Sequence, residues 1–231
     1  MQAAEFDKYA RDYLETHERN VRISGETPEY FARYKIDEVR RFWSQAGLTE
    51  PRAVLDFGAG VGNSLPHLAE SFPDARLTAL DVSTESLAVA MRRFPKIADF
   101  VCQNGPDIPL APGSFDLIFS SCVFHHIDAA QHIRTFEGLK RLLSPTGRMI
   151  IFEHNPLNPV TRHIVAGCEF DEDAVLIPAN VFKARQHAAG FAKVAVRYTG
   201  FFPGPLRKLR PLERFMTGLP IGAQYCTVAG G

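Results

Sequence analysis

Residues 54–63 carry the feature that most constrains the fold: a short apolar run, one acid and three alternating glycines. Asp56 lies within the run Val54–Phe57, and Gly58, Gly60 and Gly62 follow it. An apolar run of this length predicts a buried strand. Glycines accept positive φ and let backbone N–H groups approach a ligand closely. The segment therefore predicts a strand, a tight turn and a helix start, with a nucleotide-like ligand at the turn.

The rest of the chain alternates β-rich runs with helical segments, which is typical of a parallel sheet covered by helices. We expect strands at 53–57, 76–80, 100–102, 115–120, 148–153, 193–199 and 224–228. We expect helices at 63–71, 85–93, 129–143 and 178–189. No clear helix separates the last two strands, so an antiparallel last strand is expected. The predicted fold class is α/β: a doubly wound, Rossmann-like sheet of seven mostly parallel strands, with additional N-terminal helices.

The 231 residues fit one α/β domain with additions. Residues 5–46 have a helical apolar spacing that breaks near Gly25 and Pro28. We therefore divide the chain into a helical cap (1–46) and a main domain (47–231). The segment 155–177, which contains two Asn-Pro turns, is predicted to be a lid at the acceptor side.

Charge and composition exclude some partners. Lys plus Arg and Asp plus Glu both number 26, so no net field draws the chain to nucleic acid or to an anionic membrane. No apolar run reaches membrane-spanning length, and the N-terminus lacks the apolar core of a signal peptide. A cytoplasmic location is predicted, with the four scattered cysteines reduced. A homodimer remains open.

A second acid follows the second expected strand. Asp81 lies 25 positions after Asp56 and precedes Val82, where an acid can accept both hydroxyls of a ribose. Asn63 stands where the dinucleotide pattern G-x-G-x-x-G has its third glycine. The acid-first G-x-G-x-G spacing instead resembles motif I of the class I S-adenosylmethionine-dependent methyltransferases. Segments 100–110, 113–121 and 142–151 resemble that family's later motifs in the same order.

The resemblance implies that S-adenosyl-L-methionine is the cofactor, and it implies a set of binding residues. Asn104, next to Gly105, takes the position that contacts the adenine amino group. An N-terminal helix commonly covers the cofactor in this family. The implied cofactor residues are Asp56, Gly58, Gly60, Gly62, Asn63, Asp81, Val82, Asn104, Gly105, Ser120, Tyr9 and Tyr13.

Ligands of open α/β sheets bind beyond the carboxyl ends of the strands. His125 and His126 follow the fourth expected strand, Glu153 ends the fifth, and His154 follows it. Methyl transfer from a sulfonium is an in-line displacement, and a base helps only when the nucleophile carries a proton of high pKa. His154, His125 and His126 are therefore the catalytic candidates, with packing or shaping of the acceptor pocket as the alternative.

Two charged clusters remain. Asp171, Glu172 and Asp173 superficially resemble a metal cluster, but consecutive side chains cannot all face one point. A solvated turn is expected there, and no metal is predicted. Residues 207–214 hold a basic cluster in the last loop, which either recognises an anionic acceptor group or forms a solvated face.

The predicted function is methyl transfer from S-adenosylmethionine to a small-molecule acceptor, at O, N or C. The first alternative is a non-catalytic S-adenosylmethionine-binding regulator or scaffold. The second is a nicotinamide oxidoreductase, which Asn63 and the lack of a Tyr-x-x-x-Lys pair disfavour. A nucleic-acid acceptor is disfavoured because Ser120-Ser121-Cys122-Val123 stands in place of an Asn/Asp-Pro-Pro-Tyr motif.

Overall fold

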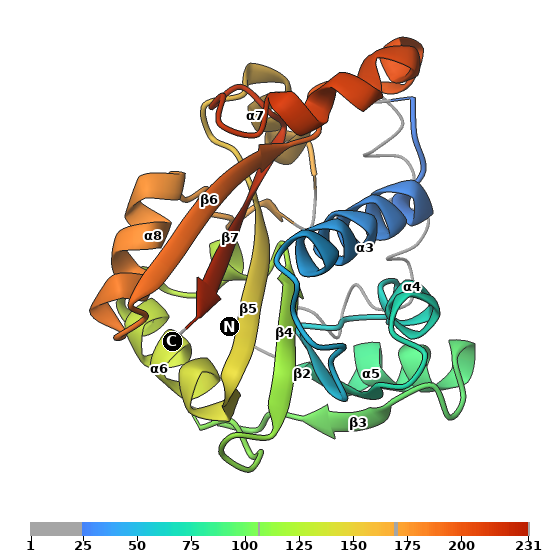
Figure 1. The fold of residues 1–231 in the computed structure, drawn as a ribbon, viewed down its shortest axis with the longest axis vertical. Coiled ribbons are helices and arrows are strands. Elements are labelled where there is room, and N and C mark those ends of the chain that lie inside the picture. Colours follow the sequence, from blue (N-terminus) through green and yellow to red (C-terminus); the bar gives the residue numbers. More distant parts are fainter. Residues whose placement is uncertain (1–24, 106, 169–170, 231) are drawn as a thin grey trace.

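A computed structural model describes residues 25–105, 107–168 and 171–230 of the chain (Figure 1). Its strands are β1 (Ala53–Phe57), β2 (Arg76–Asp81), β3 (Asp99–Cys102), β4 (Phe115–Ser121), β5 (Leu143–His154), β6 (Lys193–Thr199) and β7 (Gln224–Gly230). Its α-helices are α3 (Pro28–Gln45), α4 (Leu65–Ser71), α5 (Thr84–Arg93), α6 (His132–Leu142), α7 (Pro159–Ala166) and α8 (Ala179–Ala188). The 3-10 helices are η2 (Phe124–His126), η3 (Ala129–Gln131) and η5 (Gly204–Phe215).

The seven strands form one sheet in the order β3-β2-β1-β4-β5-β7-β6. Strands β1 to β5 pair in parallel, while β7 runs antiparallel to both β5 and β6. The predicted doubly wound class and the antiparallel last strand are confirmed. The strand order reverses between β1 and β4, and ligands of such sheets bind at this switch point.

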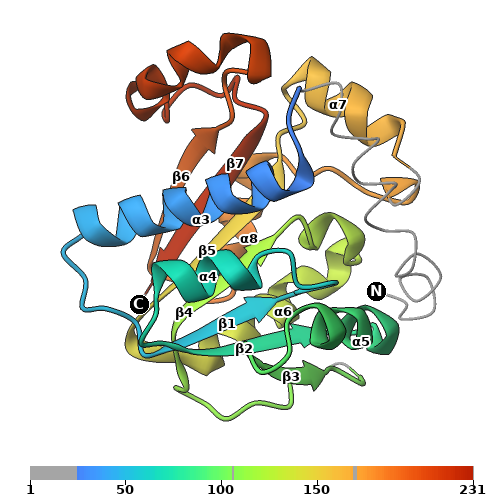
Figure 2. The same ribbon diagram turned by 90° about the vertical axis from the view of Figure 1, so that its right-hand side faces the viewer.

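Neighbouring residues of each inner strand face opposite cores, because strand side chains alternate. In β1, Val54 packs with Trp43 of α3 and Leu68 of α4. Leu55, the next residue, packs with the core cluster that contains Phe136 of α6 and Phe182 of α8. Figure 2 shows α3 and α4 together beside the sheet. The sheet is thus covered on both faces.

Helix α3 begins where the sequence breaks the N-terminal helical pattern. Thr27 is its N-cap, and the Thr27 Oγ1 accepts a hydrogen bond from the Tyr30 N–H at 3.2 Å. Ile36, Val39 and Trp43 recur on its buried face at helical spacing. This face lies in the same core as β1, so the second half of the predicted cap packs directly on the sheet. Residues 1–24, including Tyr9 and Tyr13, lie outside the described residues.

Most element boundaries agree with expectation or differ from it by one or two residues, and three differences have an identifiable cause. Helix α4 begins at Leu65 rather than at 63, because the glycine turn extends through Ser64. The helix expected at 129–143 is divided into η3 and α6. Strand β5 begins at Leu143, five residues early, because Leu143 pairs with Phe115 ahead of an irregularity in the register.

The segment 155–177 contains α7 and is held by the loop between β6 and β7. The Asn155 side-chain amide donates to the Pro220 and Gly222 carbonyls at 3.1 and 2.8 Å. The Asn158 Oδ1 caps α7 by accepting from the Thr161 N–H at 3.0 Å. Among the described residues, no helix combines the length and the apolar character that a membrane span requires.

Candidate functional site

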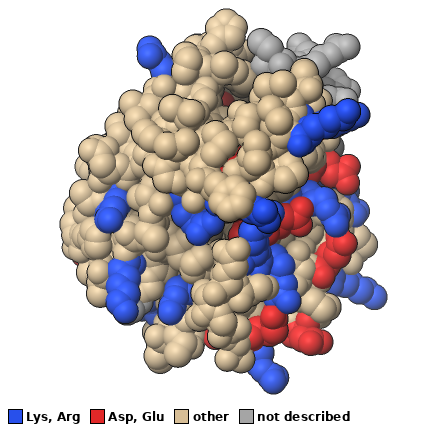
Figure 3. Space-filling model, turned by 45° about the horizontal axis from the view of Figure 1, so that its top comes forward, with Lys and Arg blue, Asp and Glu red and all other residues tan. Residues whose placement is uncertain are grey.

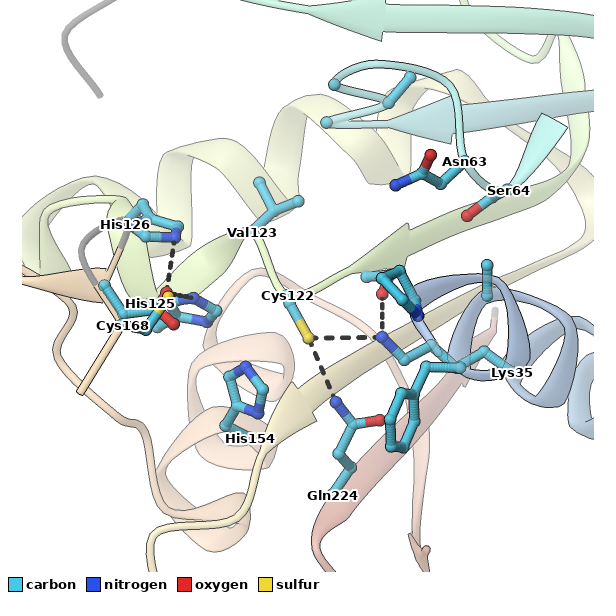
Figure 4. Close-up of a pocket in the computed structure, with 18 of the residues that line it drawn as sticks. Lys35, Asn63, Ser64, Cys122, Val123, His125, His126, His154, Cys168 and Gln224 are labelled. Carbon is cyan, nitrogen blue, oxygen red and sulfur yellow. Dashed lines mark hydrogen bonds and ion pairs between the residues drawn. The ribbon is translucent and has the colours of Figure 1, made fainter. Parts of the chain in front are cut away.

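A cavity of about 280 Å³ opens at the carboxyl ends of β1, β2, β4 and β5. One half is formed by the turn after β1 and the end of β2. The other half contains three histidines, two cysteines and one lysine. Its main polar lining residues are Asp56, Asn63, Ser64, Asp81, Lys35, Ser121, Cys122, His125, His126, His154, Cys168, Asp171 and Gln224 (Figure 4).

The turn after β1 requires glycine at two positions for different reasons. Gly58 has φ +75°, and a Cβ there would lie 2.3 Å from a methyl carbon of Val123. Gly60 has φ +53°, lines the cavity, and a Cβ there would meet no atom within 4 Å. The space above Gly60 is therefore open to a ligand. The Gly60 N–H itself donates to the Asp81 Oδ2 at 2.7 Å, which fixes the turn.

Asp56 is the penultimate residue of β1 and is 3% exposed. Its Oδ2 is buried and has no hydrogen-bond partner among the described residues, yet Asp56 lines the cavity. Burial, together with the nearby charge of Asp81, raises the pKa of Asp56 to about 7. An unpartnered carboxylate oxygen costs free energy in the empty protein. It fits a cationic group of a ligand, such as the ammonium of an amino acid.

Asp81 ends β2 and also lines the cavity. Its Oδ2 accepts from the Gly60 N–H, and its Oδ1 accepts from the Ser83 N–H at 2.9 Å. Asp81 therefore fixes the turn from a position in the cavity lining, and a carboxylate there can accept hydrogen bonds from the hydroxyls of a ligand.

The structure brings only part of the predicted cofactor set to the cavity. Asp56, Gly58, Gly60, Asn63 and Asp81 line it, whereas Gly62, Val82, Asn104, Gly105 and Ser120 do not. At Gly62, a Cβ would point at Ala90 and Leu65 rather than at the cavity. Asn104 is exposed and accepts a hydrogen bond from the Cys102 thiol, and Ser120 is fully buried. A role for these five residues stays a prediction.

The three catalytic candidates all line the cavity, but their surroundings differ. The Glu153 Oε1 accepts from the Val123 and Phe124 N–H groups at 3.1 and 2.8 Å. Its Oε2 lies 2.6 Å from the His125 Nδ1, and both side chains are 1% exposed. Glu153 therefore fixes the His125 ring and the turn that carries it.

Asp171, in the segment 155–177, contacts the two adjacent histidines. Its Oδ1 lies 3.3 Å from the His125 Nε2 and 3.4 Å from the His126 Nε2 (Figure 4). The expectation of a solvated turn was wrong for this residue, whose side chain is 14% exposed. Glu172 and Asp173 are exposed as expected. Asp171 turns inward because the imidazoles of another segment attract it.

Two carboxylates thus face the two ring nitrogens of His125. Burial alone lowers its pKa, but the charge of Glu153 and the hydrogen bonds of Asp171 and Glu153 outweigh burial and raise the pKa to about 10. Burial raises the pKa of Asp171 and of Glu153. The neighbouring histidines act in the opposite direction, and both pKa values are lowered overall. A ring that already carries both protons does not accept another. His125 therefore fits a structural role rather than that of a general base, and His154 remains the better candidate.

A second polar cluster surrounds Cys122, which has φ 58° directly after β4. Its Sγ lies 3.6 Å from the Lys35 Nζ and 3.4 Å from the Gln224 Nε2. Lys35 also donates to the Ser121 Oγ at 2.6 Å. Burial raises the pKa of Cys122, but His154 and Lys35 lower it to about 6.

Four residues that line the cavity were not predicted from the sequence: Lys35, Cys122, Asp171 and Gln224. Cys122 lies just past a strand end, which was a usable signal. Lys35 reaches the site from α3, and no local pattern marks it. The basic cluster at 207–214 does not line the cavity, and Arg210 pairs with Glu26 at 2.6 Å.

Comparison with known proteins agrees with this geometry. Residues 54–147 match the family model of a methyltransferase domain. A malonyl-[acyl-carrier protein] O-methyltransferase of Marinomonas sp. (strain MWYL1) is 29% identical over 129 residues, which are 55% of this chain and 47% of that protein. A trans-aconitate 2-methyltransferase of Rhodopseudomonas palustris (strain BisA53) is 28% identical over 133 residues, 58% of this chain and 50% of that protein. The matches thus cover about half the length of these curated relatives.

A solved structure shares the fold over nearly the whole chain. It is an S-adenosylmethionine-dependent methyltransferase, possibly a histamine N-methyltransferase, from Thermotoga maritima. The TM-score is 0.67 at 17% identity, covering 99% of this chain and 98% of that one. These likenesses, together with the glycine turn and the acids near the ends of β1 and β2, identify residues 54–147 as a methyltransferase domain, in a chain that has the fold of a solved S-adenosylmethionine-dependent methyltransferase.

Proposed function

We propose that this protein transfers a methyl group from S-adenosyl-L-methionine to an O, N or C atom of a small-molecule acceptor. The observation that carries the proposal is the unpartnered Asp56 Oδ2 in the same cavity as His154. An acid with no partner marks where a cationic ligand group binds. His154 lines the same cavity and can accept a proton beside that ligand.

The described residues fit the cofactor. Asp56 would bind the ammonium of its methionine part, Asp81 would accept the ribose hydroxyls, and the open space at Gly60 would leave room for the chain between them. The bound cofactor supplies an activated methyl group. The protein then needs mainly to align the acceptor and exclude water.

The acceptor belongs to the other half of the cavity. His154 can take a proton from a hydroxyl or amine acceptor. Lys35, which is 8% exposed, places a positive charge nearby. The lid contributes Thr161, Ile164 and Val165 to the lining, which supports segment 155–177 as a cover over the acceptor. The trans-aconitate 2-methyltransferase likeness supports a small acceptor.

The proposal also covers the class of partner, the cellular location and the domain division. Basic (blue) and acidic (red) side chains both occur on the face in Figure 3, which supports a partner other than nucleic acid. None of the four cysteines forms a disulfide bond, which supports a cytoplasmic location. The division at residue 46 and a possible homodimer remain proposals.

The proposal is tested in two steps. Isothermal calorimetry with S-adenosylhomocysteine measures cofactor binding, and mass spectrometry identifies any ligand that copurifies. Tritiated S-adenosylmethionine is then screened with a metabolite library for label transfer. Transfer to one compound class supports the proposal. Tight cofactor binding without transfer to any metabolite or extract fraction would favour the non-catalytic alternative.

A further inference from the structure

We propose that His125, His126 and Asp171 form a binding site for one divalent transition-metal ion of the Zn²⁺ type. One nitrogen of each histidine and one carboxylate oxygen of Asp171 lie within 4.8 Å of one another. Imidazole nitrogen and carboxylate oxygen are ordinary ligands of Zn²⁺. Mg²⁺ and Ca²⁺ fit less well because they prefer oxygen ligands throughout.

The distances favour a tetrahedral ion at the centre. The Asp171 Oδ1 lies 3.3 Å from the His125 Nε2 and 3.4 Å from the His126 Nε2. With bonds of roughly 2.0 to 2.1 Å, two ligand atoms of a tetrahedral Zn²⁺ lie about 3.3 Å apart. Both distances from the Asp171 Oδ1 are therefore close to the separation of two ligand atoms, and the two histidine nitrogens lie within 4.8 Å of each other.

A further carboxylate orients the first ligand. The Glu153 Oε2 lies 2.6 Å from the His125 Nδ1, while the Glu153 Oε1 is held by two backbone N–H groups. Nδ1 thus carries its proton, and Nε2 is the atom that can bind a metal in place of its own proton. A carboxylate on the far nitrogen is the usual support of a metal-binding histidine.

The position of the site indicates its use. Both histidines come from η2 at the end of β4, and Asp171 comes from the lid. All three line the cavity, so a fourth ligand position is available to water or to an oxygen of the acceptor. On the proposed function, the ion would orient that oxygen and lower the pKa of a bound hydroxyl. It would also connect the lid to the sheet.

Metal binding can be measured without turnover. The full chain is purified without a polyhistidine tag, stripped with a chelator, and titrated with Zn²⁺ or Co²⁺ in a calorimeter. Metal retained after desalting is counted by mass spectrometry. We expect one equivalent, and a visible spectrum of four-coordinate Co²⁺. His126→Ala and Asp171→Ala should each weaken binding at least tenfold.

Asp173→Ala is the matched control, since Asp173 is an exposed acid two residues from Asp171. It should bind metal like the unchanged protein. The proposal is overturned if the unchanged protein retains no equivalent of Zn²⁺, or if all three variants retain it equally. Binding of S-adenosylhomocysteine is measured in parallel on the metal-free protein. Loss of cofactor binding there contradicts the proposed function and leaves the metal result to stand separately.

Discussion

The buried Asp56 carboxylate, whose Oδ2 has no hydrogen-bond partner among the described residues, should destabilise the protein in the absence of a ligand. Its pKa is raised from 3.8 to about 7 by burial and by Asp81. The folded state therefore binds more protons than the unfolded state between these values, so stability falls as the pH rises through this window. A shift of about three pKa units, at about 1.4 kcal/mol each, lowers the free energy of unfolding by about 4 kcal/mol at pH 8.

Asp56→Asn keeps the shape of the side chain and cannot ionise. At pH 8 the variant should be more stable than the unchanged protein by about 4 kcal/mol, or roughly 8 to 16 °C in Tm for a chain of this size. At pH 5.5 the difference should shrink to about 2 kcal/mol. Binding of S-adenosylhomocysteine should nevertheless weaken by about 1.5 to 3 kcal/mol, because a charged hydrogen bond is lost.

Urea unfolding and calorimetric titration at both pH values measure these effects. Asp116→Asn is the control, since the Asp116 carboxylate is fully partnered by the Arg52 and Ala53 N–H groups and by the Ser144 hydroxyl. It should lose stability at both pH values and keep its cofactor Kd. The reasoning is refuted if Asp56→Asn is no more stable than the unchanged protein at pH 8 and binds the cofactor equally well.

Three further predictions concern the same cavity. Asp81→Ala should weaken S-adenosylhomocysteine binding by about 1.5 to 3 kcal/mol, and an unchanged calorimetric Kd would contradict the ribose role. His154→Ala should lower kcat by about 10²- to 10⁴-fold and leave the cofactor Kd unchanged, whereas full turnover across the pH range would exclude base catalysis by His154. Cys122 should react with iodoacetamide with a midpoint near pH 6, while Cys226, whose pKa burial raises to about 12, should stay inert. Peptide mass spectrometry measures both rates, and a Cys122 midpoint near pH 9 would contradict the described environment.

The sheet could be predicted because its signals are local. Apolar runs and glycine turns mark each strand, and six of the seven starts differ from expectation by no more than one residue. The start of β5 was missed because Pro145 and Gly147 have the composition of a turn. Only the pairing of Leu143 with Phe115, a tertiary contact, extends the strand.

The site residues that lie at or near strand ends could be predicted from the sequence. Ligands of open α/β sheets bind beyond the carboxyl ends of the strands, and an apolar run leads up to each of Asp56, Asp81 and His154. Lys35 reaches the cavity from α3, and Asp171 reaches it from the segment 155–177. Their sequence neighbours do not differ from those of surface residues. The prediction of exposed side chains was correct for Glu172 and Asp173. It was wrong for Asp171, because this carboxylate is attracted by histidines that lie 45 or more positions earlier in the sequence.

A crystal structure of the complex with S-adenosylhomocysteine tests the central claim most directly. The account predicts that the ligand ammonium lies within hydrogen-bond distance of the Asp56 Oδ2 and that both ribose hydroxyls contact the Asp81 carboxylate. The account is contradicted if the ligand binds elsewhere, or if Asp56 keeps no partner in the occupied protein.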